Sequence, residues 1–128
     1  LQKLETLCGE IPEPKLIGPA DAVLTLVLWG SVKNTVSDVC DLWNREHPQK
    51  SVNFLHYEYI YPVRTGSLKD LIAQNRKMVL VENNAFGQLG ALLTIETGYQ
   101  FEAKLLKFDG RPFFVEELMD YLLEKLEP

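Results

Sequence analysis

Hydrophobic and polar positions along this chain change repeatedly from a strand-like to a helix-like spacing. A continuous apolar run over residues 22–29, AVLTLVLW, predicts a strand that is buried on both faces and ends at Gly30. Apolar residues then recur at helical spacing between residues 36 and 43, with charged residues on the opposite side, until Pro48 ends the helix. Ser31 stands just before this helix and is the expected N-cap.

Three further strand and helix pairs follow the first. The second strand is SVNFLHYE, after which Pro62 and Gly66 indicate a loop, and Ser67 is expected to cap a short amphipathic helix, SLKDLIAQN. A third strand is expected at residues 77–81, followed by a helix at residues 84–97 that is closed by Gly98. A fourth strand at residues 103–108 is closed by Asp109-Gly110, and a last helix covers residues 115–126.

This order predicts one domain of the α/β class. Four repeats of a strand and a helix imply parallel neighbours joined by right-handed crossovers, and therefore a three-layer α/β/α sandwich around a mostly parallel sheet of four to five strands. The Leu16-Ile17-Gly18 segment is a candidate edge strand of opposite sense. We expect residues 1–20 to be the end of a preceding helix and a proline-rich linker, residues 21–128 to be the domain, and the chain to be an excised piece of a longer one.

Composition narrows the class of protein. With 128 residues, 46% hydrophobic and 24% charged, the chain can form one real core. A net charge of −5 without a basic run argues against a nucleic-acid partner, and no apolar stretch approaches the roughly 20 residues of a membrane span. Cys8 and Cys40 form no Cys-x-x-Cys pair, so we expect reduced thiols in a cytoplasmic protein. His47 and His56 lack neighbours at zinc spacing, so no metal site is expected.

The sequence gives only weak support for the usual motifs of catalysis and nucleotide binding. Gly30-Ser31 lies between a strand and a helix, where backbone amides can hold a phosphate, but the further glycines of a dinucleotide fingerprint and a Walker pattern are missing. His56, between Leu55 and Tyr57, is better interpreted as a hydrogen-bonded core residue than as a general base. No nucleophile elbow is present. None of these patterns identifies a catalytic residue or a cofactor-binding residue.

The segment HYEYIYPVR places tyrosines at every second residue. If the backbone stays extended, Tyr57, Tyr59 and Tyr61 share a face, and an exposed aromatic row beside Arg64 would be an interaction surface. The alternative is that the rings pack beneath a loop with their hydroxyls at the rim. The residues alone leave both interpretations open.

The junction VENNAFGQLG, where the third strand passes into a helix, holds the remaining candidates. Asn83 or Asn84 can cap the helix, which leaves the Glu82 carboxylate in need of donors or a cation, and Gln88 is one possible donor. Gly87 and Gly90 each cost about 1 kcal/mol relative to alanine in a helix, so we expect a close approach of this helix to the sheet or to another backbone.

Longer segments resemble a known family. A strand ending in VEN, then FGQLGALLTIETG and KLLKFDGRPFFVEEL, is similar to the C-terminal part of the alpha subunit of 2-oxoacid:ferredoxin oxidoreductases. DAVLTLVLWGSVKNTVSDV and VNFLHYEYIYPV match the same subunit, so the resemblance covers about residues 21–126. More distantly, the pattern resembles the C-terminal domain of the transketolase and dehydrogenase-E1 class. Val115 departs from the family, which usually has a small hydroxyl cap there.

The resemblance implies a role within a larger enzyme. That family oxidatively decarboxylates a 2-oxoacid such as 2-oxoglutarate or pyruvate with thiamine diphosphate and magnesium, passes electrons through an iron–sulfur cluster to ferredoxin, and makes an acyl-CoA from coenzyme A. It holds the thiamine between an upstream alpha-subunit domain and the beta subunit, so a domain like this one makes few or no cofactor contacts. The chain accordingly lacks a Gly-Asp-Gly motif.

We therefore expect a structural and assembly domain that is inactive alone and whose partners are the upstream alpha-subunit domains, the beta subunit and, for the whole enzyme, ferredoxin. The alternative is a freestanding domain that binds a small ligand or anion at Ser31 and the Glu82 edge. The residues expected to contact a neighbouring domain or subunit are Tyr61, Arg64, Glu82, Asn83, Asn84, Gly87, Gln88 and Gly90.

Overall fold

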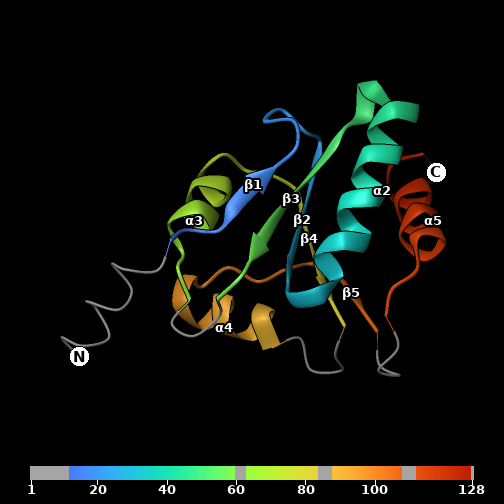
Figure 1. Cartoon of the computed structure of the whole chain (residues 1–128). Coiled ribbons are helices and arrows are strands. Elements are labelled where there is room, and N and C mark those ends of the chain that lie inside the picture. Colours follow the sequence, from blue (N-terminus) through green and yellow to red (C-terminus); the bar gives the residue numbers. More distant parts are fainter. Residues whose placement is uncertain (1–11, 60–62, 84–87, 108–111, 128) are drawn as a thin grey trace.

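The computed structural model describes residues 12–59, 63–83, 88–107 and 112–127 (Figure 1). Its strands are β1 (Lys15–Ile17), β2 (Leu24–Trp29), β3 (Val52–Tyr57), β4 (Met78–Glu82) and β5 (Ala103–Leu106). Its α-helices are α2 (Lys33–Glu46), α3 (Gly66–Ala73), α4 (Gln88–Thr97) and α5 (Val115–Leu126). Two short 3-10 turns, η1 (Gly30–Val32) and η2 (Pro48–Lys50), flank α2.

The five strands form one mixed sheet in the order β1-β3-β2-β4-β5. The pairs β2–β3, β2–β4 and β4–β5 are parallel, whereas β1 runs antiparallel to β3, with Lys15 opposite His56. The mostly parallel sheet and the edge strand of opposite sense are both confirmed. Because β1 precedes residue 21, the sheet includes part of the segment that we expected to be a linker.

The two faces of the sheet have separate cores, which makes the fold a three-layer sandwich. Alternate residues of β2 point to opposite faces, so Leu26 and Leu28 pack with α2 and α5 while Val27 packs with α3 and α4. Figure 1 shows α2 and α5 together on one side of the sheet and α3 and α4 on the other. The predicted α/β/α architecture is confirmed.

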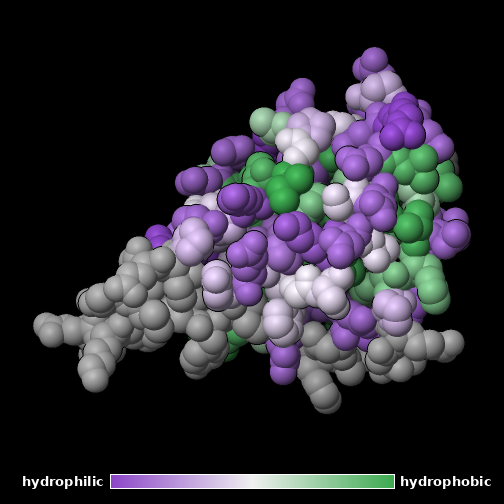
Figure 2. Space-filling view, viewed as in Figure 1, coloured by the Kyte–Doolittle hydropathy of each residue, from purple (hydrophilic) through white to green (hydrophobic). Residues whose placement is uncertain are grey.

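Polar side chains cover most of the face seen in Figure 2, and apolar ones gather on the side formed by α5. Phe114, just before α5, and Leu123 within it are 54% and 41% exposed. Among the exposed residues of α5 itself, Leu123 is apolar and the others are charged.

The expected N-cap of the first helix is wrong. Gly30, with φ of 77°, leads from β2 into η1, so α2 begins at Lys33 rather than directly after Ser31. The N-cap position is Val32, without a side-chain cap. Ser31 lies exposed in the 3-10 turn, because the chain tightens there before it becomes α-helical.

The expected cap of α3 is also wrong, because another part of the chain supplies the acceptor. The helix begins at Gly66, which places Ser67 within its first turn. The Ser67 N–H donates to Oε1 of Glu13 at 3.1 Å, and its hydroxyl donates to the Pro14 carbonyl at 3.2 Å. The start of α3 is therefore capped by Glu13, from the segment before β1, and not by the side chain of Ser67.

Helix α5 begins at the expected residue although Val115 offers no hydroxyl. The backbone N–H of Phe114 donates to Oε1 of Glu117 at 3.0 Å, which satisfies one amide at the helix start. Lys107, which follows β5, pairs with the same carboxylate at 2.6 Å. The Glu117 side chain thus replaces the missing cap and connects α5 to the end of β5.

Candidate functional site

The junction between β4 and α4 is organised by the carboxylate of Glu82, which is 1% exposed. Its Oε1 accepts hydrogen bonds from the backbone N–H of Leu89 at 2.8 Å and from the indole Nε1 of Trp29 at 2.9 Å. Its Oε2 accepts one from the Gly90 N–H at 3.2 Å. One side chain therefore joins the end of β2, the end of β4 and the first turn of α4.

This arrangement explains a carboxylate at the end of a buried strand. The first amides of a helix lack partners within the helix, and the helix dipole favours negative charge at that end. Three donors also offset the cost of removing the charge from water. The surroundings of Glu82 in the described residues are those of a structural helix cap.

The capping residue differs from the one that we expected. Oδ1 of Asn83 is buried and has no hydrogen-bond partner, so Asn83 does not cap α4, while Asn84 lies outside the described residues. The amide donors to Glu82 come from Leu89 and Gly90, whereas Gln88 is exposed at the start of the helix. A carboxylate is the stronger acceptor for helix amides, which is the physical reason for the difference.

Gly90 makes the close approach that the sequence predicted. A Cβ at this position would lie 2.4 Å from Cδ2 of Leu80, a side chain in β4 with no exposed surface. Helix α4 therefore packs so closely onto the sheet that a Cβ at this position would require the Leu80 side chain to move. Gly87, the second glycine of this prediction, and Tyr61 lie outside the described residues.

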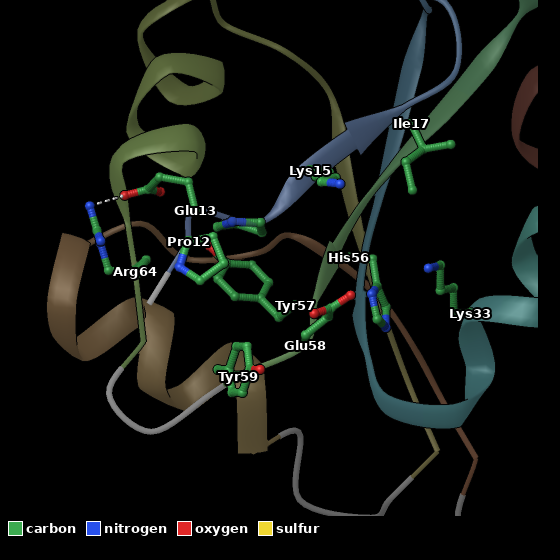
Figure 3. A pocket seen from close by; sticks show the side chains of 11 residues that line it. Pro12, Glu13, Lys15, Ile17, Lys33, His56, Tyr57, Glu58, Tyr59 and Arg64 are labelled. Atoms are coloured by element: carbon green, nitrogen blue, oxygen red, sulfur yellow. Dashed lines mark ion pairs between the residues drawn. The ribbon is translucent and has the colours of Figure 1, made fainter. Parts of the chain in front are cut away.

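A pocket of about 260 Å³ lies beside the carboxyl end of β3. Figure 3 shows that its walls come from the segment through β1, from the start of α2 and from the residues after β3. Arg64 lies at one end, where its Nη2 pairs with Oε2 of Glu13 at 2.9 Å. The lining residues are Pro12, Glu13, Pro14, Lys15, Ile17, Lys33, His56, Tyr57, Glu58, Tyr59 and Arg64.

His56 is a hydrogen-bonded core residue, as expected. Its side chain is 8% exposed, and its Nε2 lies 3.2 Å from the Gly30 carbonyl oxygen, to which it can only donate. Burial lowers the pKa of His56 from its ordinary value, while the bond to Gly30 opposes this effect. The imidazole is therefore neutral near pH 7.

The tyrosines do not form a common exposed row. Strand β3 ends at Tyr57, whose side chain is 1% exposed within the second core, whereas Tyr59 is 51% exposed. Because β3 ends at Tyr57, Tyr57 and Tyr59 do not share an exposed face, and the buried Tyr57 ring agrees with the alternative in which the ring is packed. The hydroxyl of Tyr57 is buried without a hydrogen-bond partner. Burial raises the pKa of Tyr57, and the negative charge of Glu13 makes a smaller contribution in the same direction.

Sequence reasoning missed most of this pocket. Glu13, Lys15, Lys33 and Glu58 belong to separate segments and share no motif or spacing. Of the lining residues, the sequence had marked Arg64 as a contact residue, and Tyr57 and Tyr59 as part of one of two alternatives. The antiparallel pairing of β1 with β3 places Lys15 opposite His56, and the parallel pairing of β2 with β3 brings Lys33, which follows β2, to the same end of the sheet.

Two further findings concern the parts of the chain that the structure describes. No helix there is long and apolar enough to cross a membrane. No group of three or more His, Cys, Asp or Glu side chains in those parts is arranged to hold a metal ion.

Comparison with known proteins shows which proteins this chain resembles. No protein-family model matches the chain. Over 130 residues it is 31% identical to the alpha subunit of 2-oxoacid:ferredoxin oxidoreductase 1 from Aeropyrum pernix, covering 96% of this chain and 20% of the relative. The chain is homologous to the alpha subunits of 2-oxoacid:ferredoxin oxidoreductases. It spans about a fifth of the length of the alpha subunits that it matches.

Two solved structures resemble this chain. The alpha chain of a probable 2-oxoacid ferredoxin oxidoreductase from Thermoplasma acidophilum is 28% identical, with a TM-score of 0.62 over 91% of this chain and 98% of that chain. A 2-oxoglutarate:ferredoxin oxidoreductase from Magnetococcus marinus superposes with a TM-score of 0.81 over 94% of this chain and 21% of that chain. At 19% identity, this second likeness shows the fold.

Proposed function

We propose that this chain is the C-terminal structural and assembly domain of the alpha subunit of a 2-oxoacid:ferredoxin oxidoreductase. The observation that carries the proposal is the match to an alpha subunit over 96% of the chain. In the proposal, residues 21–128 form the domain together with the edge strand β1. The complete enzyme oxidatively decarboxylates a 2-oxoacid such as 2-oxoglutarate or pyruvate, makes an acyl-CoA and reduces ferredoxin through an iron–sulfur cluster.

The residues at the carboxyl edge of the sheet suit a supporting role rather than a cofactor site. Thiamine diphosphate requires donors for its diphosphate and carboxylate ligands for its magnesium ion. Both oxygens of Glu82 already accept amide hydrogen bonds, and these amides are the donors that a diphosphate at α4 would need. We therefore assign thiamine diphosphate and magnesium to the upstream alpha-subunit domain and the beta subunit.

Within this proposal, the cap at Glu82 and the close packing at Gly90 keep one edge of the domain in a fixed shape. A rigid, hydrogen-bonded edge can dock onto a neighbouring domain or subunit with little loss of side-chain entropy. Arg64, Asn83 and Gln88 are the described candidates for such contacts, because none of them is fully buried.

The proposal is tested by assaying the chain alone and the complete enzyme side by side. Each is supplied with thiamine diphosphate, Mg²⁺, coenzyme A and either pyruvate or 2-oxoglutarate, and ferredoxin reduction is followed by absorbance. We expect turnover only from the complete enzyme. Reduction of ferredoxin by the chain alone would refute the assignment of a structural role.

A second measurement tests the edge itself. In the complete enzyme, Glu82→Ala should weaken association of the alpha and beta subunits in gel filtration or lower turnover. Glu96→Ala, which removes an exposed carboxylate from the same helix, is the matched control. Equal elution and equal turnover of the two variants would contradict a role of this edge in assembly.

The alternative of an anion site at Ser31 and Glu82 is weakened by the same geometry. Ser31 does not cap α2, and the α4 amides of Leu89 and Gly90 already bind a carboxylate. Calorimetric titration of the chain with thiamine diphosphate and with nucleotides checks this conclusion. Saturable heat from either ligand would restore the alternative.

A further inference from the structure

The hydroxyl of Tyr57 is a donor without an acceptor. Buried polar side-chain atoms in folded proteins almost always have a hydrogen-bond partner, so an exception needs an explanation. The Tyr57 side chain is 1% exposed and its hydroxyl has no partner. In Figure 3 the ring extends from β3 through the middle of the pocket toward Pro12 and Glu13. The pocket therefore contains one unused, buried hydrogen-bond donor.

Glu13 is near this hydroxyl but is held in another direction. Its Oε1 accepts the Ser67 N–H at 3.1 Å, and its Oε2 pairs with Nη2 of Arg64 at 2.9 Å. These two contacts fix the carboxylate at the start of α3. Among the described residues, none accepts a hydrogen bond from the Tyr57 hydroxyl.

The charge of the pocket indicates the kind of acceptor. Its lining contains three cationic side chains, Lys15, Lys33 and Arg64, and two carboxylates, Glu13 and Glu58, which gives a net charge of +1 with His56 neutral. The whole chain carries −5, so this pocket differs in sign from the rest of the molecule. A group with a single negative charge fits this balance better than a phosphate of charge near −2.

We propose that this pocket binds a carboxylate group, which accepts a hydrogen bond from Tyr57 and is attracted by Lys15 and Lys33. At about 260 Å³ the space is below the usual range of drug-sized ligand sites. It suits a short carboxylic acid or the side chain of an Asp or Glu from a neighbouring polypeptide. This binding site does not depend on the proposed enzyme, because its test uses the chain alone.

The test is a titration of the ¹⁵N-labelled chain with acetate and propionate, which reproduce the side chains of Asp and Glu. We expect saturable shifts of the backbone amides of Lys33, His56 and Tyr57 at millimolar concentrations. Tyr57→Phe should weaken binding about tenfold or more, because a hydrogen bond to a charged group is lost. Tyr121→Phe, on the α5 side of the sheet, is the matched control and should bind normally.

Changes in the lining charge should act in opposite directions. Lys33→Gln lowers the net charge of the lining to 0 and should weaken acetate binding, whereas Glu58→Gln raises it to +2 and should strengthen binding. Inorganic phosphate serves as the comparison anion and should bind more weakly than acetate in the unchanged chain.

Stability measurements separate a binding role from a packing role of the hydroxyl. Tyr57→Phe keeps the ring, so its urea midpoint should be equal to or higher than that of the unchanged chain, since no internal hydrogen bond is lost. A clearly lower midpoint would show an internal partner and would overturn the proposal. Absence of saturable shifts with both acids, or equal affinity of the Tyr57→Phe variant, would overturn it as well.

The length of the acid distinguishes the two sources of the carboxylate. If butyrate and hexanoate bind progressively more tightly than propionate, the pocket encloses a free acid. If affinity is greatest for acetate or propionate and falls with length, the pocket fits the side chain of an acidic residue from another polypeptide.

Discussion

At the scale of single residues, Glu82 is the most consequential side chain of the junction between β4 and α4. Glu82→Ala leaves two α4 amides and the indole N–H of Trp29 without their acceptor. We expect the free energy of unfolding to fall by about 3 kcal/mol, because buried donors lose charge-assisted hydrogen bonds. Urea denaturation followed by tryptophan fluorescence measures this loss.

The control for this prediction lies on the same helix. Glu96→Ala removes an exposed carboxylate and should change stability by no more than about 0.5 kcal/mol. If both variants lose the same stability, the carboxylate of Glu82 does not hold the start of α4 as the geometry indicates.

His56 gives a prediction about pH. Its pKa lies below the ordinary 6.5, because burial and the charge of Lys33 disfavour the imidazolium, although Gly30 and Glu58 oppose them. Between this lowered pKa and about 6.5 the unfolded chain binds more protons, so stability should rise with pH in this window and fall on acidification. The Cε1 proton resonance of His56, assigned with a His47→Gln variant, should titrate with a midpoint below 6.5. A midpoint above this value would contradict the buried, neutral imidazole.

At the scale of elements, the contact between α4 and β4 depends on the absence of a side chain at Gly90. Gly90→Ala places a Cβ 2.4 Å from Cδ2 of Leu80, which is fully buried and has little room to move. Overpacking costs about 1–3 kcal/mol, which exceeds the gain of about 1 kcal/mol in helix propensity. We therefore expect a net loss of stability in chemical denaturation.

A double variant isolates this contact. Leu80→Ala alone should cost about 2–5 kcal/mol, and adding Gly90→Ala should cost nothing more or restore part of the loss, because the new methyl group enters the space that Leu80 vacates. Additive losses in the two variants would show that α4 and β4 do not meet through these two residues.

The sequence predicted the strands and helices well where apolar periodicity is strong. Helix α5 has its predicted bounds, and the reversed edge strand β1 was recognised from three residues. The helix starts at Ser31 and Ser67 were wrong, because a 3-10 turn and the distant Glu13 decide them. Glu82 was recognised as unexplained, but its three donors became visible only when β2, β4 and α4 were placed together.

At the scale of the whole molecule, two cores share one sheet. Trp43 is fully buried between α2 and the sheet, and Trp29 packs against the opposite core. Because β2 and β4 contribute to both cores, we expect the two sides to unfold together. Single-tryptophan variants, Trp29→Phe and Trp43→Phe, should show fluorescence transitions that coincide with loss of far-UV circular dichroism.

A substitution on one side sharpens this test. Leu122→Ala opens a cavity in the core between α2 and α5 and should cost about 2–5 kcal/mol. The Trp29 fluorescence of the opposite side should report the same lowered midpoint. Two separate transitions would show that the layers are independent folding units.

The short outer strands have a consequence for behaviour at high concentration. A sheet margin with free backbone groups is a template for pairing with another molecule, and exposed lysines and small length discourage such pairing. Strand β1 has three residues and strand β5 has four, and each carries an exposed lysine, Lys15 and Lys104. Both margins are therefore poor nuclei for fibrils, and the native chain should resist growth into cross-β aggregates.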